Sequence, residues 1–254
     1  MTRGVALVRR PSRRLAEGIV THIQRRPVDV ALAGHQHEAY RAALQDAGWA
    51  VREVPPAPEL PDSVFVEDTV VVCDDLAILT RPGAPSRRAE VDGTEQVVRA
   101  LGLDVVRIAP PGTLDGGDVL QVAESVYVGS GERTNADGIR QLTEILTRRG
   151  RRVVPVPLRG VLHLKSAVTA LPDGSLLAST GLVDATAFPA VRPVEEETGC
   201  HVVPLGGDRI LIAESAPRTT DRLRSEGWSP VVVDIGEFEK LEACVTCLSV
   251  LIPQ

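Results

Sequence analysis

An internal repeat of about fifty residues is the feature of this sequence that most restricts its fold. The residues after Asp68 and after Asp118 follow the same apolar pattern without a gap, and each copy continues into a helical pattern and a further strand. The register is set by four pairs of apolar residues: Val70 with Leu120, Val72 with Val122, Leu76 with Val126 and Ile78 with Val128. Self-similarity at a fixed period of this length indicates a repeat architecture.

Further copies of this unit account for the rest of the chain. A third hairpin is predicted over 166–178, and a fourth over 201–213 with a helix and a strand after it. The C-terminal strand at 248–252 joins the N-terminal strand, helix and strand to complete a fifth unit. Pairing the two ends of the chain closes such a ring and protects its sheet edges. The sequence therefore favours an α/β fold, a five-bladed ββαβ propeller with pseudo-fivefold symmetry over residues 1–254 as one domain, above a three-layer α/β sheet.

Helices and strands alternate in the pattern that this architecture needs. The strands are short and rich in β-branched residues. Helical spacing of apolar residues occurs around 37–47, 90–101, 136–148 and 220–226.

The composition excludes several classes of protein. The net charge is −6 at pH 7, and the pI is near 5.5, whereas a nucleic-acid-binding domain usually has a basic patch and a high pI. No stretch has the ~20 consecutive apolar residues that span a bilayer. The apolar run at 5–8 is too short for a signal-peptide core. We therefore expect a soluble, cytoplasmic protein with no nucleic-acid or membrane partner.

The four cysteines are too few for a disulfide scaffold and allow several interpretations. Cys73 and Cys200 lie on or beside apolar strands, where buried, inert thiols are expected. Cys244 and Cys247 form a Cys-Val-Thr-Cys motif before the last strand, but no second ligand pair supports zinc. A thioredoxin-like pair normally lies at a strand-to-helix junction. A single cysteine nucleophile with a histidine distant in sequence remains open.

The chain has only five histidines as partners for such a nucleophile. His22, His35 and His37 lie in polar, helical stretches where exposed histidines are expected, and no third metal ligand lies near the last two. His201 begins a predicted strand. His163 precedes a repeat hairpin, where a core histidine is slightly favoured and a catalytic role stays open.

Acidic residues recur where successive units enter the middle of the molecule. They are Asp62, Glu67 and Asp68 in the motif at 60–68, and Asp115 and Asp118 in Leu-Asp-Gly-Gly-Asp at 114–118. If equivalent positions surround one axis, these carboxylates converge on one cavity and suit a cation, either a metal or a guanidinium. Turn chemistry and helix capping are the alternative for either cluster alone.

Two arginines occupy equivalent places after the second strand of successive units. Arginine abundance by itself identifies no site, because 26 of the 28 basic residues are arginine. Arg87 and Arg133 are nevertheless suited to hold a carboxylate, since guanidinium groups make planar, bidentate hydrogen bonds.

Six motifs in this order resemble the dimethylarginine dimethylaminohydrolase family and together span nearly the whole chain. They are Leu-Pro-Asp-Ser-Val-Phe-Val-Glu-Asp (60–68), Thr-Arg-Pro-Gly-Ala-Pro-Ser-Arg-Arg (80–88), Leu-Asp-Gly-Gly-Asp-Val-Leu (114–120), Glu-Arg-Thr-Asn (132–135), Leu-His-Leu-Lys-Ser (162–166) and Thr-Cys-Leu-Ser-Val-Leu-Ile (246–252). The resemblance implies the five-bladed propeller of the guanidine-modifying enzymes, without the helical domain inserted in the larger arginine deiminases.

The resemblance also implies a role for individual residues. Cys247 matches the nucleophile, His163 the general acid and base, and Asp115 a carboxylate that orients His163. The implied substrate contacts are Ile19, Asp62, Phe65, Glu67, Asp68, Arg87, Arg133 and Leu241. Among them, the two arginines would clamp the α-carboxylate, and the carbonyls of Ile19 and Leu241 would receive the α-amino group.

The implied reaction is hydrolysis of asymmetric dimethylarginine or monomethylarginine to citrulline and dimethylamine or methylamine, through a covalent cysteine intermediate and with no metal or organic cofactor. A small methylated arginine is the expected partner, and a homodimer is compatible with the sequence. Glu242 and Ala243 depart from the aspartate and glycine usual in the family. The alternatives are an enzyme for another guanidine such as arginine, and a catalytically silent regulatory homologue.

Overall fold

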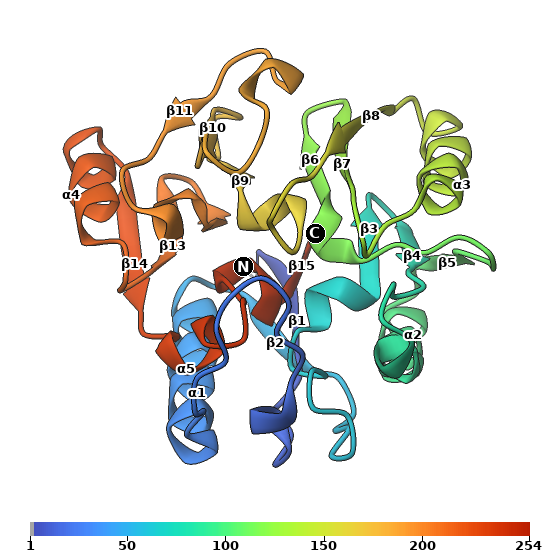
Figure 1. The fold of residues 1–254 in the computed structure, drawn as a ribbon, viewed down its shortest axis with the longest axis horizontal. Helices are drawn as coiled ribbons and strands as arrows, with labels where there is room; N and C mark the ends of the chain where they lie inside the picture. Colours follow the sequence, from blue (N-terminus) through green and yellow to red (C-terminus); the bar gives the residue numbers. More distant parts are fainter. Residues whose placement is uncertain (1–2) are drawn as a thin grey trace.

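Five three-stranded sheets surround the centre of the molecule in a computed structural model, which describes residues 3–254 (Figure 1). Each sheet joins two antiparallel strands to a third that runs parallel to the second. The sheets are β15–β1–β2, β3–β4–β5, β6–β7–β8, β9–β10–β11 and β12–β13–β14. Their strands are β1 (Gly4–Val8), β2 (Ala50–Glu53), β3 (Val70–Cys73), β4 (Leu76–Leu79), β5 (Asp104–Arg107), β6 (Val119–Val122), β7 (Ser125–Ser130), β8 (Arg152–Pro157), β9 (Val168–Ala170), β10 (Leu176–Ala178), β11 (Arg192–Pro193), β12 (Val202–Gly206), β13 (Arg209–Ala213), β14 (Ser229–Val233) and β15 (Val250–Pro253). The predicted five-unit ββαβ propeller is confirmed.

The longer helices lie on the outside of the ring, where each carries the chain across to a parallel strand (Figure 1). They are α1 (Val30–Asp46), α2 (Val91–Ala100), α3 (Ala136–Thr147) and α4 (Pro217–Ser225), and a one-turn helix α5 (Gly236–Glu239) follows later. In α3, Asn135 caps the N-terminus by accepting from the Gly138 N–H, and the apolar face with Leu142 and Leu146 packs into the core. The third unit has only a short 3-10 turn in place of the helix.

Two expectations for α1 were wrong. The helix begins at Val30, well before the predicted 37, because the Asp29 carboxylate accepts from the Ala31 and Leu32 N–H groups and caps it there. His37 is fully buried, because α1 packs against β2, β14 and α5. His22 and His35 are exposed, as predicted, although His22 lies in a loop.

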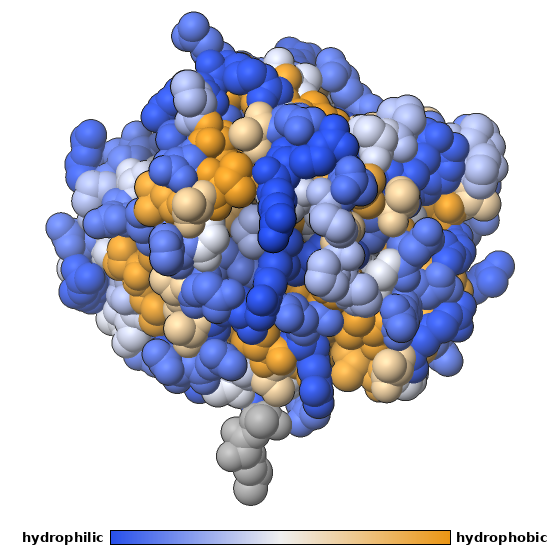
Figure 2. Space-filling view, turned by 90° about the horizontal axis from the view of Figure 1, so that it is seen from below, coloured by the Kyte–Doolittle hydropathy of each residue, from blue (hydrophilic) through white to orange (hydrophobic). Residues whose placement is uncertain are grey.

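The two ends of the chain close the ring. β15 pairs antiparallel with β1, which in turn pairs parallel with β2, so the last strand completes the first sheet. Figure 2 shows one face of the molecule, mostly hydrophilic, with hydrophobic residues in separate patches. Within residues 3–254, no helix combines the length and apolar character that crossing a membrane requires.

A 3-10 turn leads into the innermost strand of each sheet. The five turns are η2 (Val66–Thr69), η4 (Gly116–Asp118), η5 (Leu164–Ser166), η7 (Glu197–Cys200) and η8 (Val245–Leu248). The inner strands β3, β6, β9, β12 and β15 line a central cavity of about 760 Å³. The turns bring residues that are far apart in sequence to one end of this axis.

Candidate active site

Neighbouring residues in these turns face two different cavities. Asp68 and Cys247 line a small, closed cavity of about 20 Å³. Glu67 and Thr246, one residue earlier in the same turns, line the large central cavity instead. The turns η2 and η8 therefore form part of a partition between the two spaces.

The closed cavity collects most of the residues predicted from the sequence. Its volume is enough for about one water molecule. It is lined by Ile19, Asp62, Phe65, Asp68, Arg87, Arg133, Leu162, His163, Leu241, Glu242, Ala243 and Cys247. Of the predicted site residues, Asp115 lies behind His163, and Glu67 lies on the other side of the partition.

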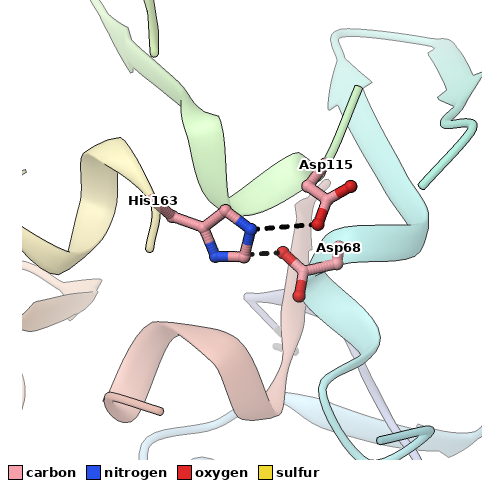
Figure 3. A group of neighbouring side chains, drawn as sticks. All are labelled: Asp68, Asp115 and His163. Carbon is pink, nitrogen blue, oxygen red and sulfur yellow. Dashed lines mark hydrogen bonds and ion pairs between the residues drawn. The ribbon is translucent and has the colours of Figure 1, made fainter. Parts of the chain in front are cut away.

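Two buried carboxylates hold the His163 ring (Figure 3). The Nε2 atom lies 3.0 Å from Oδ2 of Asp115, and Nδ1 lies 3.8 Å from Oδ1 of Asp68. The other Asp115 oxygen accepts the Gly83 N–H at 2.8 Å, which fixes the carboxylate plane. The hydrogen bond with Asp115 therefore fixes the ring, while Nδ1 makes no hydrogen bond to residues 3–254.

The charges of these groups depend on one another. Burial lowers the pKa of His163, but the charge of Asp68 and the hydrogen bond that Asp115 accepts outweigh this effect and raise the pKa to about 10. Burial alone would raise the pKa of Asp68. The charges of His163 and Arg87 outweigh this effect and lower the pKa of Asp68 to about 2. His163 is therefore an imidazolium at neutral pH.

The same three residues are the one group within residues 3–254 whose ligand atoms lie close enough to hold a metal, all within 4.8 Å of one another. The His163 imidazolium and the Arg87 guanidinium together match the two carboxylate charges, so the cluster does not require a metal for charge balance.

Cys247 shares its surroundings with a second thiol. Its sulfur lies 3.5 Å from that of Cys244 and accepts the Cys244 backbone N–H at 3.4 Å. The hydrogen bond with Cys244, burial, and the charges of Cys244, Glu67 and Asp68 raise the pKa of Cys247 well above its usual value. In these surroundings Cys247 is therefore a neutral thiol.

The two arginines of the predicted clamp differ in what they bind. Arg87 is engaged on every side: Nη1 donates to Asp68 at 2.7 Å, and Nε and Nη2 donate to Glu90 at 3.1 and 2.8 Å. Among residues 3–254, Arg133 has only a long hydrogen bond to the Thr21 hydroxyl at 3.4 Å and a 3.8 Å approach to Asp115. Arg133 therefore has the more available guanidinium.

Glu67 is committed to partners outside the closed cavity. Its carboxylate lies 2.6 Å from Nζ of Lys165 and accepts the Thr246 hydroxyl at 3.0 Å. Burial raises the pKa of Glu67 to about 7, although Lys165 opposes the shift. Nothing in the motif shows that Glu67 and Asp68 face different cavities. The sequence also did not indicate that Lys165 and Thr246 are the partners of Glu67.

A loop at residues 18–23, the cover loop, contributes Ile19 to the lining of the small cavity. The Asp62 carboxylate accepts the Ile19 N–H at 3.0 Å. The Glu242 carboxylate accepts three successive backbone N–H groups, those of Thr21 at 2.6 Å, His22 at 2.5 Å and Ile23 at 3.1 Å. The residue that departs from the family pattern therefore fastens the cover loop, a contact that sequence reasoning missed.

Known proteins are similar to this chain over most of its length. The family model "Arginine deiminase" matches residues 54–201. The N(G),N(G)-dimethylarginine dimethylaminohydrolase of Streptomyces coelicolor is 58% identical over 96% of this chain and 95% of its own length. The enzyme of that name from Pseudomonas aeruginosa is 36% identical over 96% of this chain and 97% of its own.

Solved structures show the same similarity. A cysteine-to-serine mutant of the Pseudomonas aeruginosa enzyme complexed with citrulline superposes with a TM-score of 0.91 at 33% identity, covering 99% of this chain and all of that one. A histidine-to-glycine mutant of dimethylarginine dimethylaminohydrolase, solved as an adduct with S-methyl-L-thiocitrulline, gives a TM-score of 0.92 at 33% identity, covering 98% and 99%.

Proposed function

This chain belongs to the dimethylarginine dimethylaminohydrolase family, and we propose that it performs the reaction with Cys247, His163 and Asp115. It is a hydrolase that acts on carbon–nitrogen bonds and converts N-omega-methylated arginines to citrulline and dimethylamine or methylamine. The observation that carries the residue assignment is the closed cavity in which Cys247 and His163 meet buried carboxylates and an available arginine.

The charges of the cavity suit an amino acid with a cationic end. The guanidinium lies against the acidic side of the cavity, with Asp68 and Asp62, and the α-carboxylate pairs with Arg133, whose guanidinium is more available than that of Arg87. The α-amino group lies beside the carbonyls of Ile19 and Leu241. The cavity is too small for this ligand as it stands, so the cover loop must move to admit the substrate.

The substrate itself activates the nucleophile. Nearby negative charge keeps Cys247 protonated, and a guanidinium placed beside it favours the thiolate instead. The thiolate attacks the guanidinium carbon, and the adduct collapses when the bond to the dimethylamino nitrogen breaks. His163, already an imidazolium, supplies the proton that dimethylamine needs in order to leave.

The second half of the reaction reverses these roles. The covalent intermediate is an S-alkylthiouronium on Cys247, and His163 is now neutral. His163 accepts a proton from a water molecule as that water attacks the same carbon. The carbon–sulfur bond then breaks, the remaining hydroxyl proton passes to the Cys247 sulfur, and citrulline is released with Cys247 again a thiol. Asp115 keeps the ring in place through both steps.

The free thiols fit a reducing, cytoplasmic setting.

Product analysis with three substrates tests this proposal. The protein is incubated in reductant with asymmetric dimethylarginine, monomethylarginine or arginine, and citrulline, amine and ammonia are measured. We expect citrulline with dimethylamine or methylamine, and a loss of several orders of magnitude in Cys247→Ser, because an alkoxide is much harder to form than a thiolate. If ammonia release from arginine is the main activity, the protein is an enzyme for arginine instead. If none of the three substrates is turned over, the protein is a catalytically silent homologue.

A further inference from the structure

Cys244 is a buried thiol that the proposed reaction does not use. It lies at the N-cap of η8, and Cys247 lies at the third helical position. The backbone N–H of Cys247 donates to the Cys244 sulfur, while the Cys244 N–H donates to the Cys247 sulfur at 3.4 Å. This reciprocal capping holds the two sulfurs side by side, 3.5 Å apart.

The arrangement places the two sulfurs within reach of a covalent bond. A disulfide requires them to approach by only about 1.5 Å further. Cys73 and Cys200 are also free thiols, but among residues 3–254 only Cys244 and Cys247 have sulfurs in contact with each other.

We propose that Cys244 is a resolving cysteine, which converts peroxide oxidation of Cys247 into a reversible Cys244–Cys247 disulfide. The oxidant is a hydroperoxide. The Cys247 sulfur attacks one peroxide oxygen, the O–O bond breaks, and a sulfenic acid and water form. The Cys244 sulfur then attacks the Cys247 sulfur, the S–O bond breaks, and the hydroxide leaves as a second water. Two thiols are oxidised, and one hydrogen peroxide is reduced to two water molecules.

The two cysteines have different access to the oxidant. Cys247 lines the closed cavity, whose volume of about 20 Å³ suits a molecule near the size of water, whereas Cys244 does not line it. Peroxide therefore meets Cys247 first. Either sulfur can donate across the 3.5 Å contact, so Cys247 passes its proton to the Cys244 sulfur and attacks the peroxide as the thiolate. The hydrogen bond from Cys247 and the charge of His201 lower the pKa of Cys244, despite burial, which favours the thiolate needed for the resolving step.

The loss of activity on oxidation rests on the proposed role of Cys247 as the nucleophile, whereas bridge formation does not. The test therefore reads mass and activity separately. The reduced wild type is treated with hydrogen peroxide, its remaining thiols are alkylated, and it is digested with trypsin. Cleavage after Lys240 gives a peptide, 241–254, that contains Cys244, Cys247 and no other cysteine or methionine.

We expect this peptide to lose two hydrogen atoms and to resist alkylation, and dithiothreitol to restore both its thiols and the full activity. In Cys244→Ala, and in Cys244→Ser as a second variant, the peptide should gain oxygen at Cys247 and proceed to the sulfinic acid, with activity not restored by dithiothreitol. Cys200→Ala and Cys73→Ala are the matched controls, and both should behave like the wild type.

Before oxidation, Cys244→Ala should form citrulline within a few-fold of the wild type, since hydrolysis with one cysteine nucleophile does not need a second thiol. A wild-type peptide that gains oxygen without forming a bridge would overturn the proposal. So would full recovery of Cys244→Ala by dithiothreitol after the same exposure. If the bridge forms but the protein makes no citrulline in reductant, the proposed function fails while this inference stands.

Discussion

Glu67 and Asp68 are neighbours in sequence, yet their carboxylates lie in different cavities. Asp68 pairs with Arg87 and faces His163, whereas Glu67 pairs with Lys165. The motif places both acids near the axis, which could be predicted. The face each one takes is set by a 3-10 turn whose side chains follow no simple alternation, and the partner Lys165 lies about a hundred residues away. The sequence therefore predicted that both acids lie near the axis, but it did not predict which cavity each carboxylate faces.

The difference between the two arginines leads to a prediction at this scale. Arg133→Ala should weaken binding of amino-acid substrates roughly ten- to a hundredfold in KM, because one charge-assisted contact contributes about 1.5–3 kcal/mol. Arg87→Ala should also lower the unfolding midpoint, because it leaves the buried Asp68 and Glu90 carboxylates without their cation. Steady-state kinetics and thermal unfolding measure the two effects. Unchanged KM in both variants would contradict the clamp.

The charge on His163 can be measured directly. Its pKa is raised from 6.5 to about 10, so the folded state holds this proton more tightly than the unfolded chain does. The resulting stability is fully present below about pH 6.5 and is lost as the pH rises through 10. NMR of histidine-labelled protein, with the resonance assigned by its absence in His163→Asn, should show an imidazolium throughout neutral pH. A titration of His163 near pH 6.5 would contradict the conclusion that Asp68 and Asp115 stabilise its charged form.

At the scale of elements, the outer helices α2 and α3 were the easiest parts to predict and the cover loop was the hardest. Helices α2 and α3 show apolar periodicity because one face of each packs on a sheet. The cover loop at 18–23 has no such periodicity, since backbone N–H groups and a carboxylate from the distant Glu242 hold it in place. Contacts to backbone leave little trace in sequence.

This contact predicts how the loop responds to loss of one charge. Glu242→Gln keeps the size of the side chain but replaces the carboxylate that accepts from Thr21, His22 and Ile23. A hydrogen bond to a charged group contributes about 1.5–3 kcal/mol, so amide exchange in the loop should accelerate roughly ten- to a hundredfold. Hydrogen-exchange mass spectrometry measures this. Glu124→Gln, at an exposed hairpin turn, is the control, and equal protection in both variants would show that Glu242 does not fasten the loop.

At the scale of the whole molecule, closure of the ring was predictable because the repeat left one strand at the C-terminus and two at the N-terminus. Five units require these strands to share a sheet, and β15–β1–β2 is that sheet. The sequence did not indicate how closely the strands meet. A Cβ atom on Gly4 would lie 2.2 Å from the carbonyl oxygen of Ile252, and Gly4 has φ of +146°. Both facts require glycine at this seam.

The seam therefore predicts a substitution that acts on the whole ring. Gly4→Ala adds a clash with the backbone of β15 and a backbone strain of about 1–3 kcal/mol, so it should lower the free energy of unfolding by at least that range. Gly34→Ala is the matched control: Gly34 lies in α1, a Cβ there meets nothing within 4 Å, and the change should stabilise by about 0.5–1 kcal/mol. Because Trp49 lies near the seam and Trp228 in the fourth unit, tryptophan fluorescence and circular dichroism should report one shifted transition in Gly4→Ala. If the ring does not depend on this closure, the terminal strands would fray alone and the main transition would stay where it is in the wild type.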